Sequence, residues 1–531
     1  MDTKLFSMIQ ASRPKMGNVA EGLAYKQMTP ERCMRYIDEI LTELNRNFPP
    51  GFKYEGMVKC SAMMQFQEML KLPKRRKHYE LSKTDCFVVH CKFSLYGVDL
   101  RPRALLLPIV DRHGITSIWG TTFVLSPVAV DNIFSSENGS IFIQFIGSRD
   151  NFHALDVSFM VNGLTRRSST VYAELHKKAD ASDRKSTLFN YIAATYGVTE
   201  TFKLFFDAEV VVGDELNEAD YPPEEWAMCS SHGKGTRYRG PTTAIKLAVR
   251  KEDMSKPGVE SAIGAFFFCL DTVVPKGFVE VEYINEPIMW RRILSHFIFK
   301  DEDIVKNMKK IEEHLASLPG YVNSITRRKL HLEGVMVNDM DGLMAHLMSN
   351  FNIICNAREA SDVTDKRLTV MRYVLFDIEN RLVRLSFEAK KITDAAISRE
   401  KIETLLDKKW PADAISNIRE KHGEVSVLAT PNDNFMLKVT LPVVGQENAN
   451  GKRGSGSINL QNPLYRLHAS SAGLYSYELI NKSKPTGTTR LNPFINVDDD
   501  GKVTISQDLK MRIEETQKVI TRKVGTDEKA E

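Results

Sequence analysis

The sequence predicts a multidomain fold that mixes α-helices and β-strands. Its 531 residues correspond to three or four units at roughly 150 residues per domain. Hydrophobic residues make up 42% of the chain, which is enough to bury several cores. Stretches with helical spacing of apolar residues alternate with short runs rich in β-branched and aromatic residues. These observations together indicate a mixed α+β architecture.

Composition excludes several classes of protein. The net charge is only +4, from 72 basic and 68 acidic residues, so any nucleic-acid surface must be a local patch. The seven cysteines form no C-x-x-C pair, which disfavours a zinc ribbon and is typical of reduced thiols. The N-terminus lacks an apolar signal core, and no apolar run approaches the roughly 20 residues of a membrane helix. We therefore expect a soluble intracellular protein without a membrane contact.

The first 154 residues are expected to contain a helical segment, 1–50, followed by a strand-rich domain, 51–154. In the first, Thr29 precedes Pro30, a pair typical of a helix start, and apolar residues follow at helical spacing. In the second, short β-rich runs from 84 to 146 are separated by Gly, Pro and Asn.

Residues 155–345 are expected to form a separate domain. A helical pair at 187–206 is predicted to break at Gly197. Further elements are expected as strands at 242–250 and 263–284 and as helices at 287–299 and 301–316.

The remaining chain begins with 346–444, where a long helix is predicted at 364–390. Its apolar residues advance by three and four positions and form one stripe: Leu368, Met371, Leu375, Ile378, Leu382 and Leu385. A strand is expected at 435–444, and a helix at 506–522.

Two acidic motifs raise the question of a catalytic site. "NDMDG" places Asp339 and Asp341 two positions apart, as in the aspartate loops of polymerases, but Leu343 follows where a third aspartate is needed. A turn that caps a helix at 341–350 is the favoured interpretation, and a free-standing nucleotidyltransferase is the alternative. "NVDDDGK" at 496–502 lacks the ligand spacing of an EF-hand and is expected to be a hairpin turn.

Basic stretches are candidates for contact with nucleic acid. "KLPKRRKHYE" (71–80) and "SSHGKGTRYRG" (230–240) are typical of exposed basic loops. Between 451 and 490 six cations, interspersed with amides and hydroxyls, face one acid, Glu478. Such a mixture suits phosphate oxygens. The candidate nucleic-acid-binding residues are Lys452, Arg453, Asn462, Arg466, His468, Lys482, Lys484 and Arg490.

Four stretches, taken in order, resemble the β subunit of multisubunit DNA-directed RNA polymerase. "LPIVDRHGITSIWGTTFVLSPVAVDNIF" (107–134) is similar to a strand–turn–strand segment of that family. "GLTRRSSTVYAEL" with "LFNYIAATYGVTETFKLFF" is similar to the entry into its lobe domain. "SDVTDKRLTVMRYVLFDI" (361–378) is similar to the return into its protrusion domain. "LQNPLYRLHASSAG" (460–473) resembles the fork and rifampicin-pocket motif beside the RNA–DNA hybrid.

The resemblance implies the N-terminal half of a β subunit, in the split form that giant bacteriophages encode. The protrusion would comprise 51–154 and 346–444, and the lobe 155–345. The fork and hybrid-channel segment would comprise 445–495, and a docking helix and tail 496–531.

The implied function is that of a subunit, outside the catalytic centre, of a phage multisubunit DNA-dependent RNA polymerase. It would form one side of the DNA cleft and of the RNA–DNA hybrid channel and would be inactive alone. Implied partners are the C-terminal half of β, β′-like subunits, the DNA template and the RNA transcript. No cofactor is expected on this chain, because Mg²⁺ would lie on a partner subunit. The expected location is the host cytoplasm or the virion. The alternative is a phage structural or DNA-packaging protein.

Overall fold

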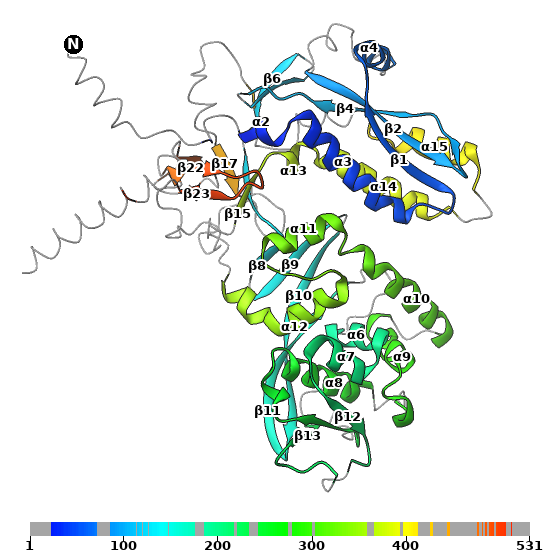
Figure 1. Ribbon diagram of the computed structural model, residues 1–531, viewed down its shortest axis with the longest axis vertical. Helices are drawn as coiled ribbons and strands as arrows, with labels where there is room; N and C mark the ends of the chain where they lie inside the picture. Colours follow the sequence, from blue (N-terminus) through cyan, green and yellow to red (C-terminus); the bar gives the residue numbers. More distant parts are fainter. Residues whose placement is uncertain are drawn as a thin grey trace, which may run out of the picture. The chain divides into compact units, whose positions relative to one another are not determined.

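The chain forms two compact units. A computed structural model describes residues 18, 23–71, 85–112, 114–118, 120–125, 127–137, 139–146, 148–175, 185–216, 220–232, 243–273, 279–299, 303–357, 366–392, 397–412, 425–427, 443–446, 475–476, 480–481, 484–485, 488–492, 495–505 and 511. Unit 1 comprises Met1–Asn132 and Ala360–Glu531, and unit 2 comprises Ile133–Glu359 (Figure 1). The predicted mixed α+β class is confirmed, and the chain leaves unit 1 once and returns to it.

Unit 1 begins with the helices α2 (Leu23–Gln27) and α3 (Pro30–Leu44). The Thr29 hydroxyl accepts the Arg32 N–H at 3.4 Å, which confirms the predicted helix start. One face of α3 is buried and contacts α14; its buried residues are Cys33, Ile37, Ile40, Leu41 and Leu44.

Unit 1 also contains an antiparallel sheet, which α3 contacts. Its strands are β1 (Phe52–Lys59), β2 (Cys86–Leu95), β3 (Val98–Asp99) and β4 (Arg103–Pro108). Helix α4 (Ala62–Leu70) lies between β1 and β2 in the sequence. Helix α15 (Arg399–Lys409) belongs to the second stretch of unit 1, after the chain has returned from unit 2. Just after α15, Trp410 meets Phe93 edge to face at 5.6 Å and donates to the Ala104 carbonyl at 2.7 Å. Arg103 contacts Asp407. The returning segment is thus built into the core of the first strands.

A second sheet also joins the two stretches of unit 1. Its strand order is β15 (Lys366–Thr369), β7 (Val128–Asp131), β17 (Val443–Gln446), β21 (Thr488–Leu491) and β18 (Tyr475–Ser476). Strands β7 and β17 are parallel, and the other pairs are antiparallel. A three-stranded sheet of β16 (Val425–Val427), β6 (Thr121–Leu125) and β5 (Ile115–Ile118) repeats this pairing of early with late residues.

The outer edge of β15 has specific hydrogen-bonding partners. The buried Gln27 amide donates to the Leu368 carbonyl and accepts the Val370 N–H, both at 2.8 Å. The Leu368 N–H donates to the Gly501 carbonyl at 2.8 Å. Gly501 lies in the turn of the hairpin β22 (Ile495–Val497) and β23 (Val503–Ile505), which confirms the predicted acidic turn at 496–502.

The predicted helix at 364–390 is wrong in its first third. The structure has β15, then α13 (Met371–Val374) and α14 (Phe376–Lys390). Leu368 is buried, but as a strand residue opposite Ala129 of β7. Pairing with an available strand edge overrides the helical spacing there. From residue 376 onward the stripe is helical as expected, and Ile378, Leu382 and Leu385 are buried.

Unit 2 is a seven-stranded antiparallel sheet with helices. The strands occur in the order β12 (Val210–Gly213), β14 (Lys246–Arg250), β13 (Trp226–Ser231), β10 (Ser148–Val161), β9 (Ser140–Phe145) and β8 (Phe134–Glu137), and β11 (Leu164–Ala173) also pairs with β10. The helices are α6 (Leu188–Tyr196), α7 (Val198–Phe206), α8 (Val259–Val273), α9 (Pro287–Ile298), α10 (Ile304–Ser317), α11 (Ser324–Leu332) and α12 (Met340–Ala357). Its range is wider than the expected 155–345, because β8 and β9 pair with β10 and α12 continues to Ala357.

One predicted strand of unit 2 is a helix. Residues 263–284 were expected to be a strand, yet 259–273 form α8. The aromatic run of α8 is buried on nearly all sides, and a helix in that position loses the amphipathic spacing that would reveal it. A Cβ on Gly264 would lie 2.4 Å from Val157 Cγ2, so glycine permits the close packing of α8 on β10.

The other predicted helices of unit 2 are confirmed. Gly197, at φ +80°, separates α6 from α7. Helices α9 and α10 match the expected ranges, and the Asp303 carboxylate caps α10 by accepting the Val305 N–H at 3.0 Å. Across the ranges that the structure describes, no helix combines the length and the apolar character needed to cross a bilayer.

Candidate functional site

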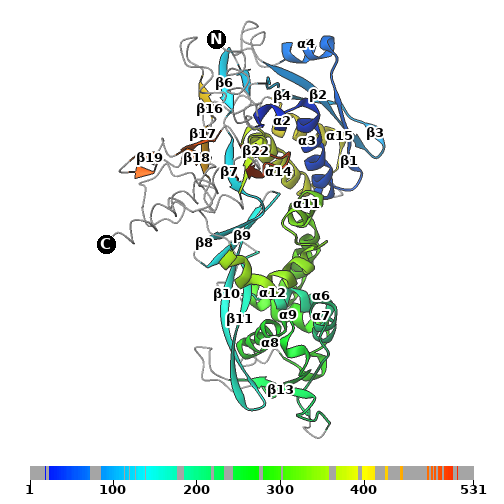
Figure 2. The ribbon, with the colours of Figure 1, turned by 60° about the vertical axis from the view of Figure 1, so that its left-hand side comes forward.

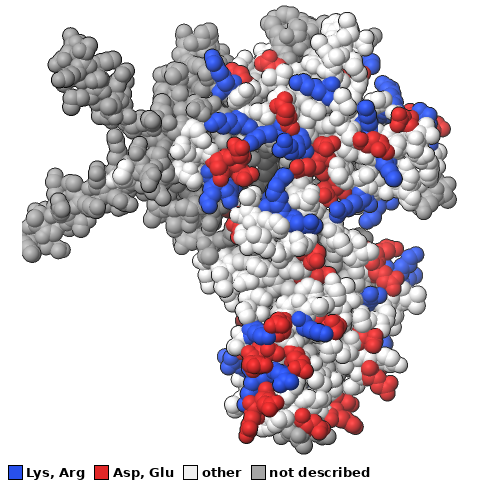
Figure 3. Space-filling model, viewed as in Figure 1, with Lys and Arg blue, Asp and Glu red and all other residues white. Residues whose placement is uncertain are grey.

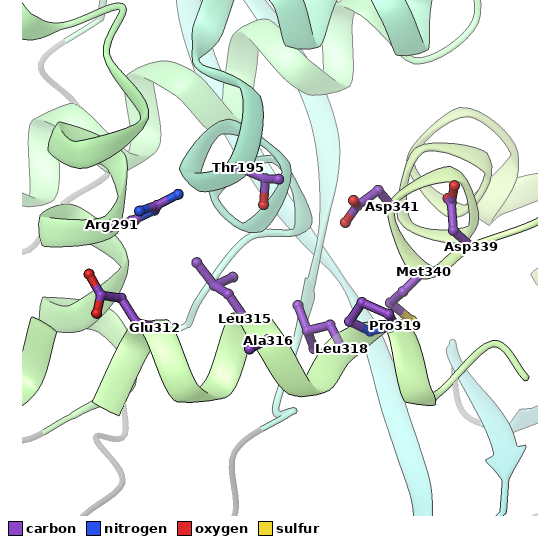
Figure 4. A pocket seen from close by; sticks show the side chains of 10 residues that line it. All are labelled: Thr195, Arg291, Glu312, Leu315, Ala316, Leu318, Pro319, Asp339, Met340 and Asp341. Atoms are coloured by element: carbon purple, nitrogen blue, oxygen red, sulfur yellow. The ribbon is translucent and has the colours of Figure 1, made fainter. Parts of the chain in front are cut away.

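A pocket of about 320 Å³ in unit 2 contains the acidic motif that the sequence singled out. It lies where the ends of α6 and α10 and the start of α12 meet α9 (Figure 4). Its lining residues are Thr195, Arg291, Glu312, Leu315, Ala316, Leu318, Pro319, Asp339, Met340 and Asp341.

Each aspartate of the motif has a structural partner. Asp339 Oδ1 accepts the Gly342 N–H at 2.7 Å, and its carbonyl accepts the Leu343 N–H. Asp339 therefore caps α12, which confirms the predicted cap, although the helix continues to Ala357. Asp341 Oδ2 accepts the Tyr196 hydroxyl at 3.1 Å.

Burial determines the electrostatics of this pair. It raises the pKa of Asp341 above its usual value; the Asp339 charge adds to that rise, and the Tyr196 hydrogen bond opposes it. Burial, together with the charge of Asp341, also raises the pKa of Tyr196 to about 12. The hydroxyl therefore remains a donor at neutral pH, and it stabilises the ionised form of the carboxylate.

The arrangement does not fit a two-metal centre. Figure 4 shows Arg291 and Glu312 at one end of the pocket and the two aspartates at the other, with Leu315 and Leu318 between them. In the described part of the chain, no three His, Cys, Asp or Glu residues are grouped so that they could hold a metal ion. Arg291 Nε donates to the Ala194 carbonyl at 3.0 Å, so it is tied to α6. The pocket can accommodate a small group, but its polar atoms mainly stabilise the helix ends.

Most of the predicted nucleic-acid-binding residues lie outside the residues that the structure describes. These are Lys452, Arg453, Asn462, Arg466, His468 and Lys482. Most of the basic stretches at 71–80 and 230–240 lies outside as well. The contacts predicted for them remain predictions.

Two of the predicted residues belong to described strands. Lys484 is in β20 (Lys484–Pro485), which pairs with β19 (Ile480–Asn481). Arg490 is in β21, opposite Val443 of β17 and Ser476 of β18. The backbone at Arg490 is thereby part of the five-stranded sheet of unit 1, of which Figure 2 labels β7, β17 and β18.

On one face of the protein, the described surface carries charges of both signs. On the face in Figure 3, cationic and anionic side chains are interspersed over both units. Several cations are paired: Arg166 contacts Glu260 at 2.6 Å, and Arg250 contacts Glu209 at 2.7 Å.

Sequence reasoning missed two buried polar pairs. Lys366, only 2% exposed, contacts Asp131 at 3.0 Å across β15 and β7. The Ser231 hydroxyl donates to Asp271, whose pKa is raised by burial. The members of both pairs are far apart in sequence, so no local motif indicates them.

Comparison with known protein families identifies the family of the chain. No curated protein matches the chain. A family model described as "Non-virion RNA polymerase subunit" matches residues 14–517, which is nearly the whole sequence and includes both units. The chain therefore belongs to the family of non-virion RNA polymerase subunits, and it is a subunit of a phage RNA polymerase.

Proposed function

We propose that this chain is the N-terminal half of a split β subunit, with unit 1 as the protrusion and unit 2 as the lobe. In this role it forms one side of the DNA cleft and a wall of the RNA–DNA hybrid channel. The alternative of a structural or DNA-packaging protein has no support, because the matched family is one of polymerase subunits.

The path of the chain carries this proposal. The sequence resemblance implies a protrusion that is interrupted by a lobe and then resumed. In the structure, unit 1 is assembled from two separated stretches and unit 2 from the continuous stretch between them. Strands β7 and β15 lie on either side of the insertion and pair with each other, so the chain leaves and re-enters unit 1 at one place.

The predicted fork segment starts and ends on the same sheet. Strand β17 precedes most of 445–495, β21 follows it, and the two strands pair antiparallel. Both ends of the segment are therefore tied to unit 1. Lys, Arg and amide groups contact phosphates without reading base sequence, which a channel wall needs because the duplex must move past it.

The reaction centre itself belongs to partners in this proposal. In this proposal Asp339 and Asp341 act in capping α12 and in the bond to Tyr196, not as Mg²⁺ ligands. A β′-like subunit would hold Mg²⁺, which supplies charge stabilisation for nucleotidyl transfer. The other partners would be the C-terminal half of β, reached in part through 496–531, the DNA template and the RNA transcript. The family description favours the cytoplasm of the infected host over the virion.

Removing charge from the fork segment tests the proposal. The variant Arg466→Gln/Lys482→Gln/Lys484→Gln is compared with the wild type in assembled elongation complexes. Each lost phosphate contact lowers the slope of log affinity against log salt by roughly 0.7–0.9, so three lower it by about 2 to 3. Dissociation of the complexes is measured at KCl concentrations from about 50 to about 400 mM, because contacts with phosphate weaken as salt rises over this range.

A matched control removes the same charge elsewhere. Lys251→Gln/Lys306→Gln/Lys309→Gln changes three exposed lysines of unit 2. The control is expected to keep the wild-type slope. If the fork variant assembles and its complexes resist salt as the wild type does, the channel-wall assignment is incorrect. An equal decrease of the salt slope in both variants would mean that the net charge of the chain, and not the fork segment, determines the salt dependence.

A further inference from the structure

Helix α4 has its apolar side turned away from the protein. It is the nine-residue segment Ala62–Leu70 after β1, and it has no buried residue. Met63, Phe66 and Leu70 are exposed by 68%, 60% and 43%. They occupy positions i, i+3 and i+7, which lie on one face of a helix.

The opposite, polar side of α4 is attached to the sheet. Gln65 Nε2 donates to the Cys86 carbonyl of β2 at 2.9 Å. Glu68 lies 3.3 Å from His90 Nε2, also on β2, and 2.8 Å from Lys71 Nζ. The Ser61 hydroxyl caps the helix by accepting the Met64 N–H at 3.4 Å. The helix is therefore fixed in this orientation by polar contacts.

The other helices of unit 1 show the usual orientation. Helices α3 and α14 turn their apolar faces inward, and their stripes are buried. A fixed helix that presents methionine, phenylalanine and leucine to water at i, i+3 and i+7 has the anchor pattern of a helix that docks into a groove. Methionine, with its flexible thioether, is frequent on such surfaces.

Charge at both ends of the helix indicates the partner. Lys59 precedes α4 and Lys71 follows it, and both are exposed. Glu68, the one acidic residue of the helix, contacts both Lys71 and His90, so the helix and its two flanking lysines keep a net positive charge. A complementary surface is therefore apolar at its centre and acidic at its rim.

We propose that α4 docks into an apolar, acid-rimmed groove on another subunit of the polymerase. Membership in a family of polymerase subunits means that such partners exist. The inference rests on that membership and not on the proposed place of the chain in a β subunit. The stripe of Met63, Phe66 and Leu70 provides the anchors of the contact.

Substitution of the central anchor tests the interface. The full-length Phe66→Gln variant is titrated with the remaining polymerase subunits, co-expressed and purified without this chain. Loss of a central aromatic anchor is expected to weaken binding about 30-fold. The thermal midpoint of the isolated chain should not fall, because Phe66 is mainly solvent-exposed in it. Leu204→Gln, at an apolar residue of α7 that is 58% exposed, is the matched control and should bind as the wild type does.

Crosslinking identifies the occupant of the face. A photoreactive phenylalanine derivative replaces Phe66 in the assembled polymerase, and the crosslinked peptide is identified by mass spectrometry. A peptide of another subunit, apolar and flanked by Asp or Glu, is the expected product. A crosslink to nucleic acid, to a second copy of this chain or to this chain itself would overturn the proposal. Unchanged affinity of the Phe66→Gln variant would overturn it as well.

Discussion

Lys366 and Asp131 form a buried ion pair whose two members contribute unequally to the stability of unit 1. The two residues are register partners in β15 and β7, so the pair joins the outgoing and returning stretches of unit 1. Lys366 is only 2% exposed, whereas Asp131 is 20% exposed, at an Nζ–Oδ1 distance of 3.0 Å. Removing the carboxylate leaves a buried ammonium, whereas removing the lysine leaves a carboxylate that water can reach.

The magnitudes follow from this difference in exposure. Loss of one partner of a buried pair costs about 3–5 kcal/mol. We expect about 3 kcal/mol for Asp131→Ala, at the lower end because the site is partly solvated. For Lys366→Met, which fills the same space without a charge, we expect about 1 kcal/mol or less. The double variant should be more stable than Asp131→Ala alone, with a coupling of about 2 kcal/mol.

Hydrogen exchange measures the effect separately in each unit. Because the protein has two units, a single unfolding midpoint would mix their stabilities. In the Asp131→Ala variant, peptides covering β7 and β15 should exchange more than 100-fold faster, since 1.36 kcal/mol corresponds to a factor of ten. Peptides covering α8 in unit 2 serve as the internal control and should be unchanged.

Two results would refute this reasoning. Equal losses of stability from Asp131→Ala and Lys366→Met would mean that the solvent exposure of the remaining charge does not determine the loss. A double variant as unstable as the sum of the single variants would mean that the two charges do not interact.

Three further predictions concern unit 2 and helix α3. Burial raises the pKa of Asp341, so the folded state loses stability as pH rises from 3.8 through the raised pKa. Asp341→Asn should therefore stabilise unit 2 over the wild type more at pH 7 than at pH 3.5, as measured by hydrogen exchange in α12. Gly197→Ala places a Cβ 2.2 Å from the Asn285 carbonyl oxygen and should lower the free energy of unfolding in urea by more than about 2 kcal/mol. Gly163 has the same φ but open space around it, so Gly163→Ala should lower that free energy by only about 1 kcal/mol. Thr29→Ala removes the cap of α3 and should cost about 1 kcal/mol, seen as faster hydrogen exchange in that helix.

The features that sequence predicted well depend on neighbouring residues. A cap, a helix break and a tight turn are each decided within about five residues. Thr29, Asp303 and Gly197 therefore act where their sequence context indicated. The same holds for Asp339, which was expected to cap a helix and does so.

The features that sequence predicted poorly depend on distant residues. Residues 366–369 have helical spacing, but the edge of β7, more than 230 positions earlier, makes them a strand. The run in α8 is buried on nearly all sides, so its apolar pattern distinguishes poorly between helix and strand.

The same division applies to the candidate sites. The bond between Tyr196 and Asp341 spans 145 positions, and no motif connects them. The sequence analysis did not indicate α4, and the contacts of Gln65 and Glu68 with β2 show that its apolar face is turned outward. The fork segment was chosen by its charge and resemblance, and its contacts remain predictions.

The interrupted path of unit 1 has a consequence for synthesis on the ribosome. Strand β7 is made early, but both of its neighbours in the sheet, β15 and β17, are made only after the whole of unit 2. Unit 2 is continuous and can close its core while the nascent chain is still growing. Unit 1 must hold two unpaired strand edges open until translation has passed residue 446, so it is the last part of the protein to become native and the part most exposed to aggregation during translation.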